Sequence, residues 1–195
     1  MTKVIFDISM SLDGYIAAPN DRPGEELGDG GQRLHAWLFD EATDTDREVA
    51  EETSNGAGAV ISGARTVDIC LDVWGGKPPS ELPWFVLSHD KPERFAKANR
   101  GFNFVLDGVE SAVDQAKSAA GSGYVLVMGG ASAGQQCLQA GLVDEMQIHL
   151  APVLFGNGIR LLENIDAERI GLETTRVIET PAATHLQYRI VRHPS

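Results

Sequence analysis

The stretch that decides the fold is Tyr124-Val-Leu-Val-Met-Gly-Gly-Ala-Ser-Ala-Gly134. Its first five residues form an apolar run of strand length, which passes directly into the glycine pair Gly129-Gly130. A helix over 133–140 is predicted to follow, because Gly141 is a residue type that commonly ends helices. A strand that turns straight into a helix is typical of parallel α/β proteins, and the turn offers backbone N–H groups to an anion.

The same arrangement recurs nearer the N-terminus. An apolar strand over 57–62 runs into Gly63-Ala-Arg-Thr66, where a guanidinium and a hydroxyl suit phosphate oxygens. A third strand, over 84–88, ends at Ser88. Because parallel strands end at one edge of a sheet, these three segments predict a ligand crevice at that edge.

Apolar periodicity and turn residues place the other elements. We expect strands at 4–10, 103–106, 146–151, 172–178 and 185–191, helices at 46–54 and between Asp107 and Gly121, and a long loop at 19–32. Two capping boxes, Thr45-x-x-Glu48 and Asp107-x-x-Glu110, mark the helix starts. The acidic face of the first helix, which includes Asp46, is predicted to be a solvated surface.

The order of these elements predicts an α/β fold in a single domain over residues 1–195. Strand–helix units in the first two-thirds indicate a mostly parallel central sheet with helices on both faces. The alternating segments from 146 onwards indicate antiparallel C-terminal strands. Because such strands leave a sheet edge open to pairing, we expect a homodimer.

Composition excludes several classes of partner. The chain has 16 Lys and Arg against 28 Asp and Glu, a net charge of −12, and no basic run, which argues against nucleic acid or anionic lipid. No signal peptide or membrane-length apolar stretch is present, so we expect a soluble, cytoplasmic protein. The two cysteines, Cys70 and Cys137, do not indicate a disulfide framework, and the histidines lack metal-ligand spacing.

One alternative function is serine hydrolysis. Gly130-Ala-Ser-Ala-Gly134 matches the G-x-S-x-G pattern between a strand and a helix, with Ser132 as nucleophile. Asp144 or Asp166 and then His185 would complete a triad. Against this, the residues after Ser132 are predicted to form antiparallel strands rather than further strand–helix units.

Five segments, in this order, carry a family resemblance. They are Ser11-Leu-Asp-Gly-Tyr-Ile-Ala17, Leu34-His-Ala-Trp-Leu-Phe39, Gly63-Ala-Arg-Thr66, Met128-Gly-Gly-Ala131 and Val143-Asp-Glu-Met-Gln-Ile-His-Leu-Ala-Pro-Val-Leu-Phe-Gly-Asn-Gly158. The set resembles the dihydrofolate-reductase-like superfamily, and more narrowly the C-terminal reductase domain of the bifunctional riboflavin-biosynthesis deaminase–reductase and its stand-alone relatives. The resemblance implies a three-layer α/β/α fold, NADPH as hydride donor and a homodimer.

By position, the resemblance also implies site residues. Cofactor phosphates would be held by Gly63, Arg65 and Thr66, and the pyrophosphate by Gly129, Gly130, Ala131 and Ser132. Ser88 would lie near the adenosine half, and Ile16 and Ala17 would flank the nicotinamide. Asp13 would face the substrate as the candidate catalytic group, a proton donor or an orienting residue, because reduction of C=N or C=O needs a proton source.

The sequence also departs from the riboflavin-pathway pattern. Met128 occupies the position before Gly129-Gly130 where those reductases tend to carry an acidic residue. The riboflavin-pathway substrate bears a ribose phosphate that needs cationic partners, and the 19–39 loop region offers only Arg22 and Arg33. The expected activity is therefore hydride transfer to a small heterocyclic or ribosylamine-type substrate, similar to 5-amino-6-(5-phosphoribosylamino)uracil reductase. A non-catalytic nucleotide-binding protein is the remaining alternative. Trp37 and Trp74 are expected in the core or as pocket walls.

Overall fold

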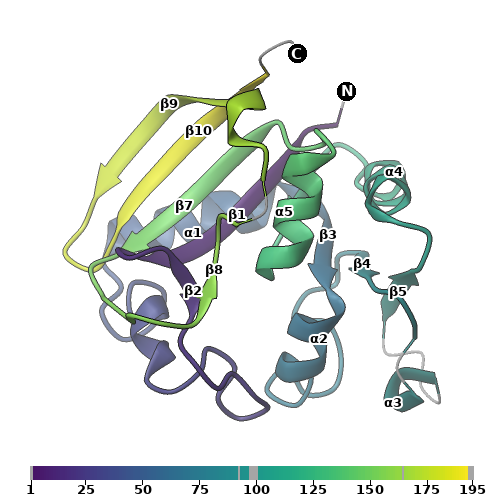
Figure 1. The fold of residues 1–195 in the computed structure, drawn as a ribbon, viewed down its shortest axis with the longest axis horizontal. Helices are drawn as coiled ribbons and strands as arrows, with labels where there is room; N and C mark the ends of the chain where they lie inside the picture. The colour runs from purple at the N-terminus through teal and green to yellow at the C-terminus, as the bar shows by residue number, and fades with distance from the viewer. Residues whose placement is uncertain (1, 92, 97–100, 164, 193–195) are drawn as a thin grey trace.

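An eight-stranded sheet forms the centre of the computed structural model, which describes residues 2–91, 93–96, 101–163 and 165–192 (Figure 1). Its strands are β1 (Val4–Ser11), β3 (Ala57–Gly63), β4 (Trp84–Leu87), β5 (Phe102–Val105), β6 (Tyr124–Val127), β7 (Glu145–Ala151), β9 (Ile170–Glu179) and β10 (Thr184–Arg192). A small second sheet pairs β2 (Tyr15–Ala17) with β8 (Ile159–Arg160). The helices are α1 (Asp44–Gly56), α2 (Ala64–Cys70), α3 (Glu93–Ala96), α4 (Val109–Ala119) and α5 (Ala131–Gln139), with short 3-10 helices η1 (Gly31–His35) and η2 (Ala167–Arg169).

The strand order is β5-β4-β3-β6-β1-β7-β10-β9. The six strands from β5 to β7 are parallel to one another, and β10 is antiparallel to both of its neighbours. The prediction of a mostly parallel sheet with antiparallel C-terminal strands is therefore confirmed. It was wrong for β7, which pairs parallel with β1 because α5 carries the chain across the sheet before β7 begins.

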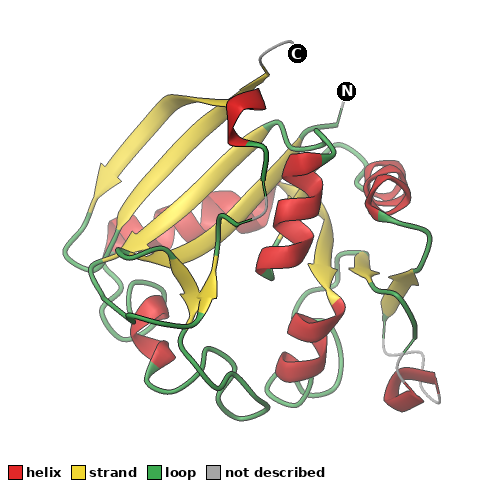
Figure 2. Ribbon diagram, viewed as in Figure 1, coloured by secondary structure: helices red, strands yellow, loops and turns green. Residues whose placement is uncertain are grey.

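Helices cover both faces of the sheet and make three layers (Figure 2). On one face, α4 and α5 enclose the larger core, which includes Phe6 and Ile61. Gly134 of α5 lies so close to β1 that an added Cβ would stand 2.0 Å from Phe6 Cζ. On the other face, α1 lies behind β1 and β7, and a smaller core joins α2 to Trp84. In the described part of the chain, no helix is long and apolar enough to cross a membrane.

The starts of two helices differ from the predicted capping boxes. Helix α1 begins two residues early, with Thr43 as its cap: Asp46 N–H donates to Thr43 Oγ1 at 3.2 Å, and Thr43 N–H donates to Asp46 Oδ2 at 2.7 Å. Asp46 is therefore fully buried, and its prediction as a solvated residue was wrong. Helix α4 is preceded by Gly108 without a side-chain cap, so the Asp107 box was also wrong.

The reason for the shift in α1 is the face that packs on the sheet. Asp46, Val49 and Thr53 are its buried residues, and their spacing of three and four places them on one side of a helix. Glu48, on the other side, stays exposed. Burial of this face thus selects Thr43 rather than Thr45 as the cap.

Candidate active site

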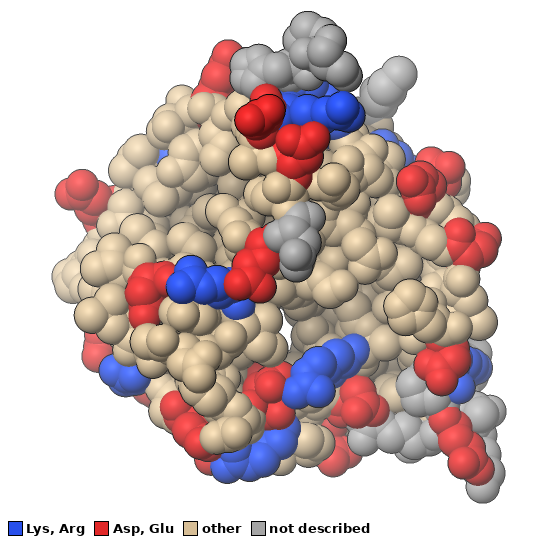
Figure 3. Space-filling view, in the orientation of Figure 1, with Lys and Arg blue, Asp and Glu red and all other residues tan. Residues whose placement is uncertain are grey.

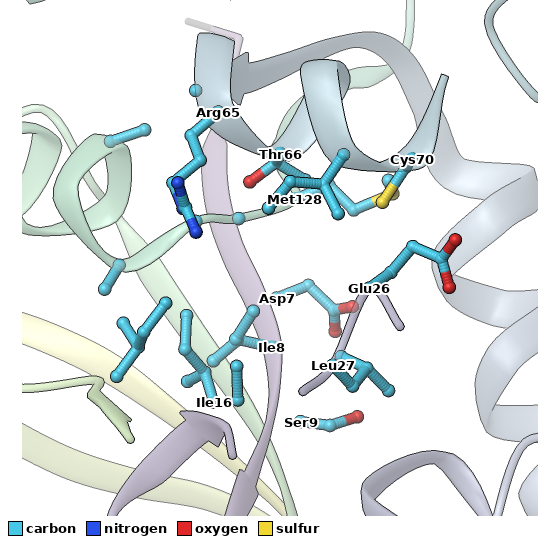
Figure 4. Close-up of a pocket in the computed structure, with 18 of the residues that line it drawn as sticks. Asp7, Ile8, Ser9, Ile16, Glu26, Leu27, Arg65, Thr66, Cys70 and Met128 are labelled. Carbon is cyan, nitrogen blue, oxygen red and sulfur yellow. The ribbon is translucent and has the colours of Figure 1, made fainter. Parts of the chain in front are cut away.

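A cavity of about 1150 Å³ opens at the carboxyl edge of the parallel strands. It is lined by the ends of β3, β4 and β6, the middle of β1, and parts of β2, α2, α5 and the 18–40 segment. Of the residues predicted for the site, it brings together Ile16, Ala17, Gly63, Arg65, Thr66, Ser88, Gly129, Gly130, Ala131 and Ser132. Figure 4 shows Arg65, Thr66 and Met128 facing Asp7, Ile8 and Ile16 across it.

The glycine turn between β6 and α5 presents bare backbone to the cavity. Gly129 has a φ of 90°, a left-handed conformation that suits glycine, and its carbonyl accepts the N–H of Gly63 at 3.0 Å. An added Cβ at Gly130 would lie 3.0 Å from Thr66 Oγ1, so a side chain there would crowd the space between the two strand ends. The turn opens α5, a nine-residue helix whose N-terminal N–H groups and dipole favour an anion.

Arg65 and Thr66 lie in the first turn of α2, beside the glycine turn. The Arg65 guanidinium is held at the rim by Asp21 of the long loop, with Nε 3.0 Å from Oδ2 and Nη2 2.7 Å from Oδ1. Arg65 is the one Lys or Arg among the described residues that line the cavity, whereas Asp7, Asp21, Glu26, Asp40 and Asp90 are acidic. On the face drawn in Figure 3, described Lys and Arg side chains stand singly or beside Asp and Glu around a central hollow.

Ser88 and the β2 residues lie at different parts of the cavity wall. Ser88 follows β4, and its hydroxyl donates to the carbonyl of Asp90 at 2.5 Å, which shapes the turn there. Ile16 and Ala17 belong to β2, which β8 holds in place through antiparallel pairing. Trp37 and Trp74 both line the cavity.

Asp13 is not among the described residues that line the cavity. Its carboxylate accepts the Ser11 hydroxyl at 2.6 Å and the backbone N–H groups of Phe155 and Gly156 at 3.1 and 2.6 Å. The Ser11 hydrogen bond, followed by those two N–H groups, lowers the pKa of Asp13 despite an opposing desolvation effect. The geometry makes Asp13 a tie between the β1–β2 turn and the loop after β7.

Sequence reasoning missed a group of polar residues on the α1 face of the sheet. Asp7 and Ser9 of β1 and His149 of β7 line the cavity, together with His35 of η1. His149 contacts Asp7 at 2.9 Å and stacks on Trp37, with ring centroids 4.3 Å apart. The available signal was a histidine on each of two alternating segments, but their pairing depended on a strand order that periodicity does not supply.

The serine-hydrolase triad is not formed. Ser132 Oγ accepts from Gln136 at 3.1 Å, while both ring nitrogens of His185 contact other residues, His149 and Asp46. Asp144 accepts the Val4 N–H at 2.8 Å. The G-x-S-x-G match therefore marks only the start of α5, because His185, the expected general base, is bonded to other residues and not to Ser132.

Cysteine chemistry is also disfavoured in the cavity. Burial, and secondarily the charge of Glu26, raises the pKa of Cys70 to about 12. The thiol therefore stays protonated at neutral pH and is a poor nucleophile. Cys137 is a second free thiol, on the buried face of α5.

These observations define the class: a mostly parallel sheet between two helical layers, with a cavity at its carboxyl edge, has the dihydrofolate-reductase-like fold. The sequence matches the RibD C-terminal domain family over residues 2–186, and the chain belongs to that family. The family is related to the riboflavin-pathway reductase. Among curated proteins, none matches the sequence.

Solved structures agree with this fold. A protein from Shewanella sp. PV-4 assigned to riboflavin biosynthesis has a TM-score of 0.69 and 24% identity, covering 98% of this chain and 100% of that one. A deaminase/5-amino-6-(5-phosphoribosylamino)uracil reductase from Thermotoga maritima has a TM-score of 0.65 and 18% identity, covering 97% of this chain and 57% of its own. Dihydrofolate reductase from Enterococcus faecalis, complexed with NADP(H), has a TM-score of 0.63 and 14% identity, covering 96% of each chain.

Proposed function

We propose that this protein is an NADPH-dependent reductase that transfers a hydride to a small heterocyclic or ribosylamine-type substrate. The observation that supports it is one continuous cavity, which joins the Gly129–Ser132 turn at the start of α5 to the polar wall at Asp7 and His149. The first part suits a dinucleotide phosphate, and the second suits the reacting end of a substrate. Membership of the RibD C-terminal domain family supports the same reaction class.

The residues present fit the cofactor. Bare backbone at Gly129 and Gly130 leaves room for a pyrophosphate against the N-terminus of α5, where a Cβ added at Gly130 would stand 3.0 Å from Thr66 Oγ1. Arg65 would meet the 2′-phosphate, Ser88 the adenosine half, and Ile16 and Ala17 the nicotinamide. When bound, the reduced nicotinamide supplies the hydride.

The charge around the cavity favours a substrate without a phosphate. Arg65 is the one Lys or Arg among the described lining residues, and the cofactor would use it. Neither Arg22 nor Arg33 is available in the arrangement seen: Arg22 pairs with Asp29 at 2.8 Å, and Arg33 lies over the ring of Phe155, outside the described lining. A second phosphate would therefore face several carboxylates without a partner, which is unfavourable.

The test combines binding with turnover. NADPH fluorescence is titrated with purified protein, and NADPH oxidation is then followed with dihydropterins, flavins, small cyclic imines, aldehydes, and pyrimidine ribosylamines with and without the 5′-phosphate. We expect saturable NADPH binding and reduction of at least one neutral heterocycle in preference to its phosphorylated form. Failure to bind NADPH at millimolar concentration would overturn the proposal, and binding without any oxidation would favour a non-catalytic nucleotide-binding protein.

We also propose a homodimer formed through β9. This strand is the last of the main sheet among the described residues, and its Leu172 and Val177 side chains are 46% and 51% exposed. A second copy would cover these apolar groups and the open strand edge. Sedimentation at micromolar protein should give a dimer mass, and a Val177→Lys variant should shift it to the monomer; a monomeric wild-type protein would contradict this assembly.

A further inference from the structure

Three buried titratable side chains and the partly exposed Asp7 form one hydrogen-bonded line that reaches the cavity at one end. His149 Nε2 lies 2.9 Å from Asp7 Oδ1, and the Nδ1 atoms of His149 and His185 lie 2.7 Å apart. His185 Nε2 then lies 2.8 Å from Asp46 Oδ1. The exposed fraction of the side chains falls from 17% at Asp7 to 0% at Asp46, so the line runs from the cavity into the protein.

The sheet register builds this line. His149 of β7 is the direct partner of Ser9 on β1 and of His185 on β10, so both imidazoles project from the same face of the sheet. Helix α1 covers that face and brings Asp46 against His185. The line therefore depends on four separate elements.

Hydrogen bonding along the line requires three protons. Each of its three contacts joins two atoms that are acceptors when unprotonated, so each contact needs one proton. Two neutral imidazoles supply two protons, which leaves one buried contact with facing lone pairs. Such a contact is unfavourable, because both groups lose their hydration and no hydrogen bond forms between them. The line is thus satisfied when it holds one excess proton, on an imidazole or on an aspartate.

The surroundings place the excess proton at the cavity end. Burial alone would raise the pKa of Asp46, but hydrogen bonds from Thr43, His185 and Thr180 hold it below its ordinary value, so this carboxylate stays ionised. Burial lowers the pKa of His185 despite its bond to Asp46. The excess proton is therefore placed away from Asp46, toward the end of the line where Asp7 and His149 lie 2.9 Å apart.

Neighbouring groups keep the proton in the line. Trp37 stacks on His149 and meets His185 edge-on, with centroids 5.0 Å apart, while its indole N–H donates to Ser9 at 3.0 Å. An aromatic face stabilises an imidazolium beside it. The Trp37 ring thus supports the charged form of His149 and fixes the orientation of both imidazoles.

Three further titratable groups, on η1, on β6 and in the long loop, lie around the line. Burial, and then the positive charge of His149, lowers the pKa of His35 on η1 to about 4, so this imidazole is neutral at pH 7. Burial, followed by the charge of Asp7, raises the pKa of Tyr124 on β6 to about 12, and its hydroxyl binds the Thr53 carbonyl. Glu26, from the long loop, is the further acid drawn beside Asp7 in Figure 4.

We propose that Asp7 is the proton donor of the reduction and that His149, His185 and Asp46 are positioning residues that hold its proton and replace it. This rests on the proposed reductase function. In the step, the carbon of a substrate C=N or C=O bond accepts the hydride of the reduced nicotinamide. The π electron pair forms a new bond from the nitrogen or oxygen to the Asp7 proton, and the Asp7 O–H bond breaks. Asp7 is left as a carboxylate and the nicotinamide is left oxidised; the line returns a proton to Asp7 and regains its own from solvent in the cavity.

The substrate class follows from this placement. Its reducible bond must present an unprotonated nitrogen or oxygen to Asp7, so a neutral imine-type or carbonyl-containing heterocycle fits. The acidic lining described above excludes a phosphate near this end. Trp37, which stacks on His149, contributes an apolar wall to the same cavity.

The first test needs neither cofactor nor substrate. Ring-nitrogen NMR of the apoprotein, recorded through neutral pH, should show the two histidines titrating as one coupled pair. Asp46→Asn should shift the ring signals of His149, which it does not touch, whereas Asp44→Asn, an exposed carboxylate on the same helix, should leave them unchanged. If His149 titrates independently of His185 and is unaffected by Asp46→Asn, the proposed coupling along the line is overturned.

The second test uses the compound that the wild-type protein reduces fastest in the screen above. Asp7→Asn should lower the hydride-transfer rate by about 10²–10⁴-fold with NADPH affinity retained, and the residual rate should fall about tenfold per pH unit because hydronium becomes the proton donor. Asp46→Asn should lower kcat more than it changes KM. It should also move the loss of activity to lower pH, because the negative charge of the Asp46 carboxylate, which favours the protonated line, is removed. Asp44→Asn should change neither.

The outcomes separate the two proposals. No NADPH binding by the wild-type protein overturns the reductase function and the donor role with it. If Asp7→Asn turns over the substrate as fast as the wild type and with the same pH profile, the donor role alone is overturned. His185→Gln, which retains a neutral hydrogen-bonding side chain, provides a second variant if Asp46→Asn does not fold; an unchanged pH profile in this variant contradicts the proton supply.

Discussion

The Arg65 guanidinium binds both carboxylate oxygens of Asp21, across 44 residues of sequence and at the rim of the cavity. Arg65 also donates to the backbone carbonyl of Asp21 at 3.1 Å. The pair joins α2 to the long loop, and it holds the guanidinium toward the space where we place the cofactor (Figure 4). Two predictions depend on this contact.

Replacement of Arg65 should weaken the binding of NADPH more than the binding of NADH. Arg65→Ala removes one charged hydrogen-bonding partner of the 2′-phosphate, so NADPH binding should weaken by about 1–3 kcal/mol more than NADH binding. Titration of both cofactors by fluorescence measures the difference. Arg189→Ala, an exposed arginine paired with Glu173 on the C-terminal strands, is the control and should bind both cofactors as the wild type does. Equal losses for NADPH and NADH would remove Arg65 from the 2′-phosphate.

Replacement of Asp21 should have the opposite effect. Asp21→Asn removes a negative charge from the rim and frees Arg65 from its partner, so NADPH should bind about two- to fivefold more tightly. The gain should shrink at high salt, because the Arg65 side chain, which is 66% exposed, is screened from the phosphate. Weaker NADPH binding in this variant would mean that the pair must stay intact to position Arg65.

An added methyl group in the glycine turn should exclude the pyrophosphate. Gly130→Ala places Cβ 3.0 Å from Thr66 Oγ1, a small adjustment for the protein but an obstruction for a ligand against the N-terminus of α5. NADPH affinity should fall at least about tenfold, whereas the free energy of unfolding should change by no more than about 1 kcal/mol. Urea unfolding and cofactor titration on the same sample separate the two quantities. Unchanged affinity would place the phosphates elsewhere.

Stability should decline in mild acid because of His35. Its folded pKa is about 4, against 6.5 in the unfolded chain, so the unfolded state binds a proton that the folded state excludes. The stability from neutral His35 is complete above about pH 6.5 and is lost as pH falls toward 4, on the order of 3 kcal/mol in total. Burial lowers the pKa of His185 as well, which adds in the same direction.

Denaturant unfolding at a series of pH values measures this decline. His35→Gln should flatten the slope, since the titrating group is removed. His89→Gln, an exposed histidine after β4, is the matched control and should retain the wild-type slope. A wild-type free energy of unfolding that is constant from neutral pH down to about pH 4.5 would contradict the prediction.

Much of the fold could be predicted because its signals are local. The β3–α2 and β6–α5 units follow from apolar runs that end in glycine, and the alternating segments after residue 170 became β9 and β10. The errors occurred where a local signal competed with burial. Thr45-x-x-Glu48 is a valid capping box, but the contact of Asp46 with His185 selects Thr43 as the cap.

The sequence by itself determined the parallel β-α units and the glycine turn at one end of the cavity, because each depends on neighbouring residues and on backbone preferences. Only the tertiary structure decided which residues meet at the polar end of the cavity. Asp7 meets His149 across 142 residues, and Asp46 meets His185 across 139. Strand order and register bring them together, and no periodicity within a segment encodes either. A buried charge is stable only beside its partner, so the position of Asp46 inside the protein, rather than on its surface, depended on a histidine at the far end of the chain.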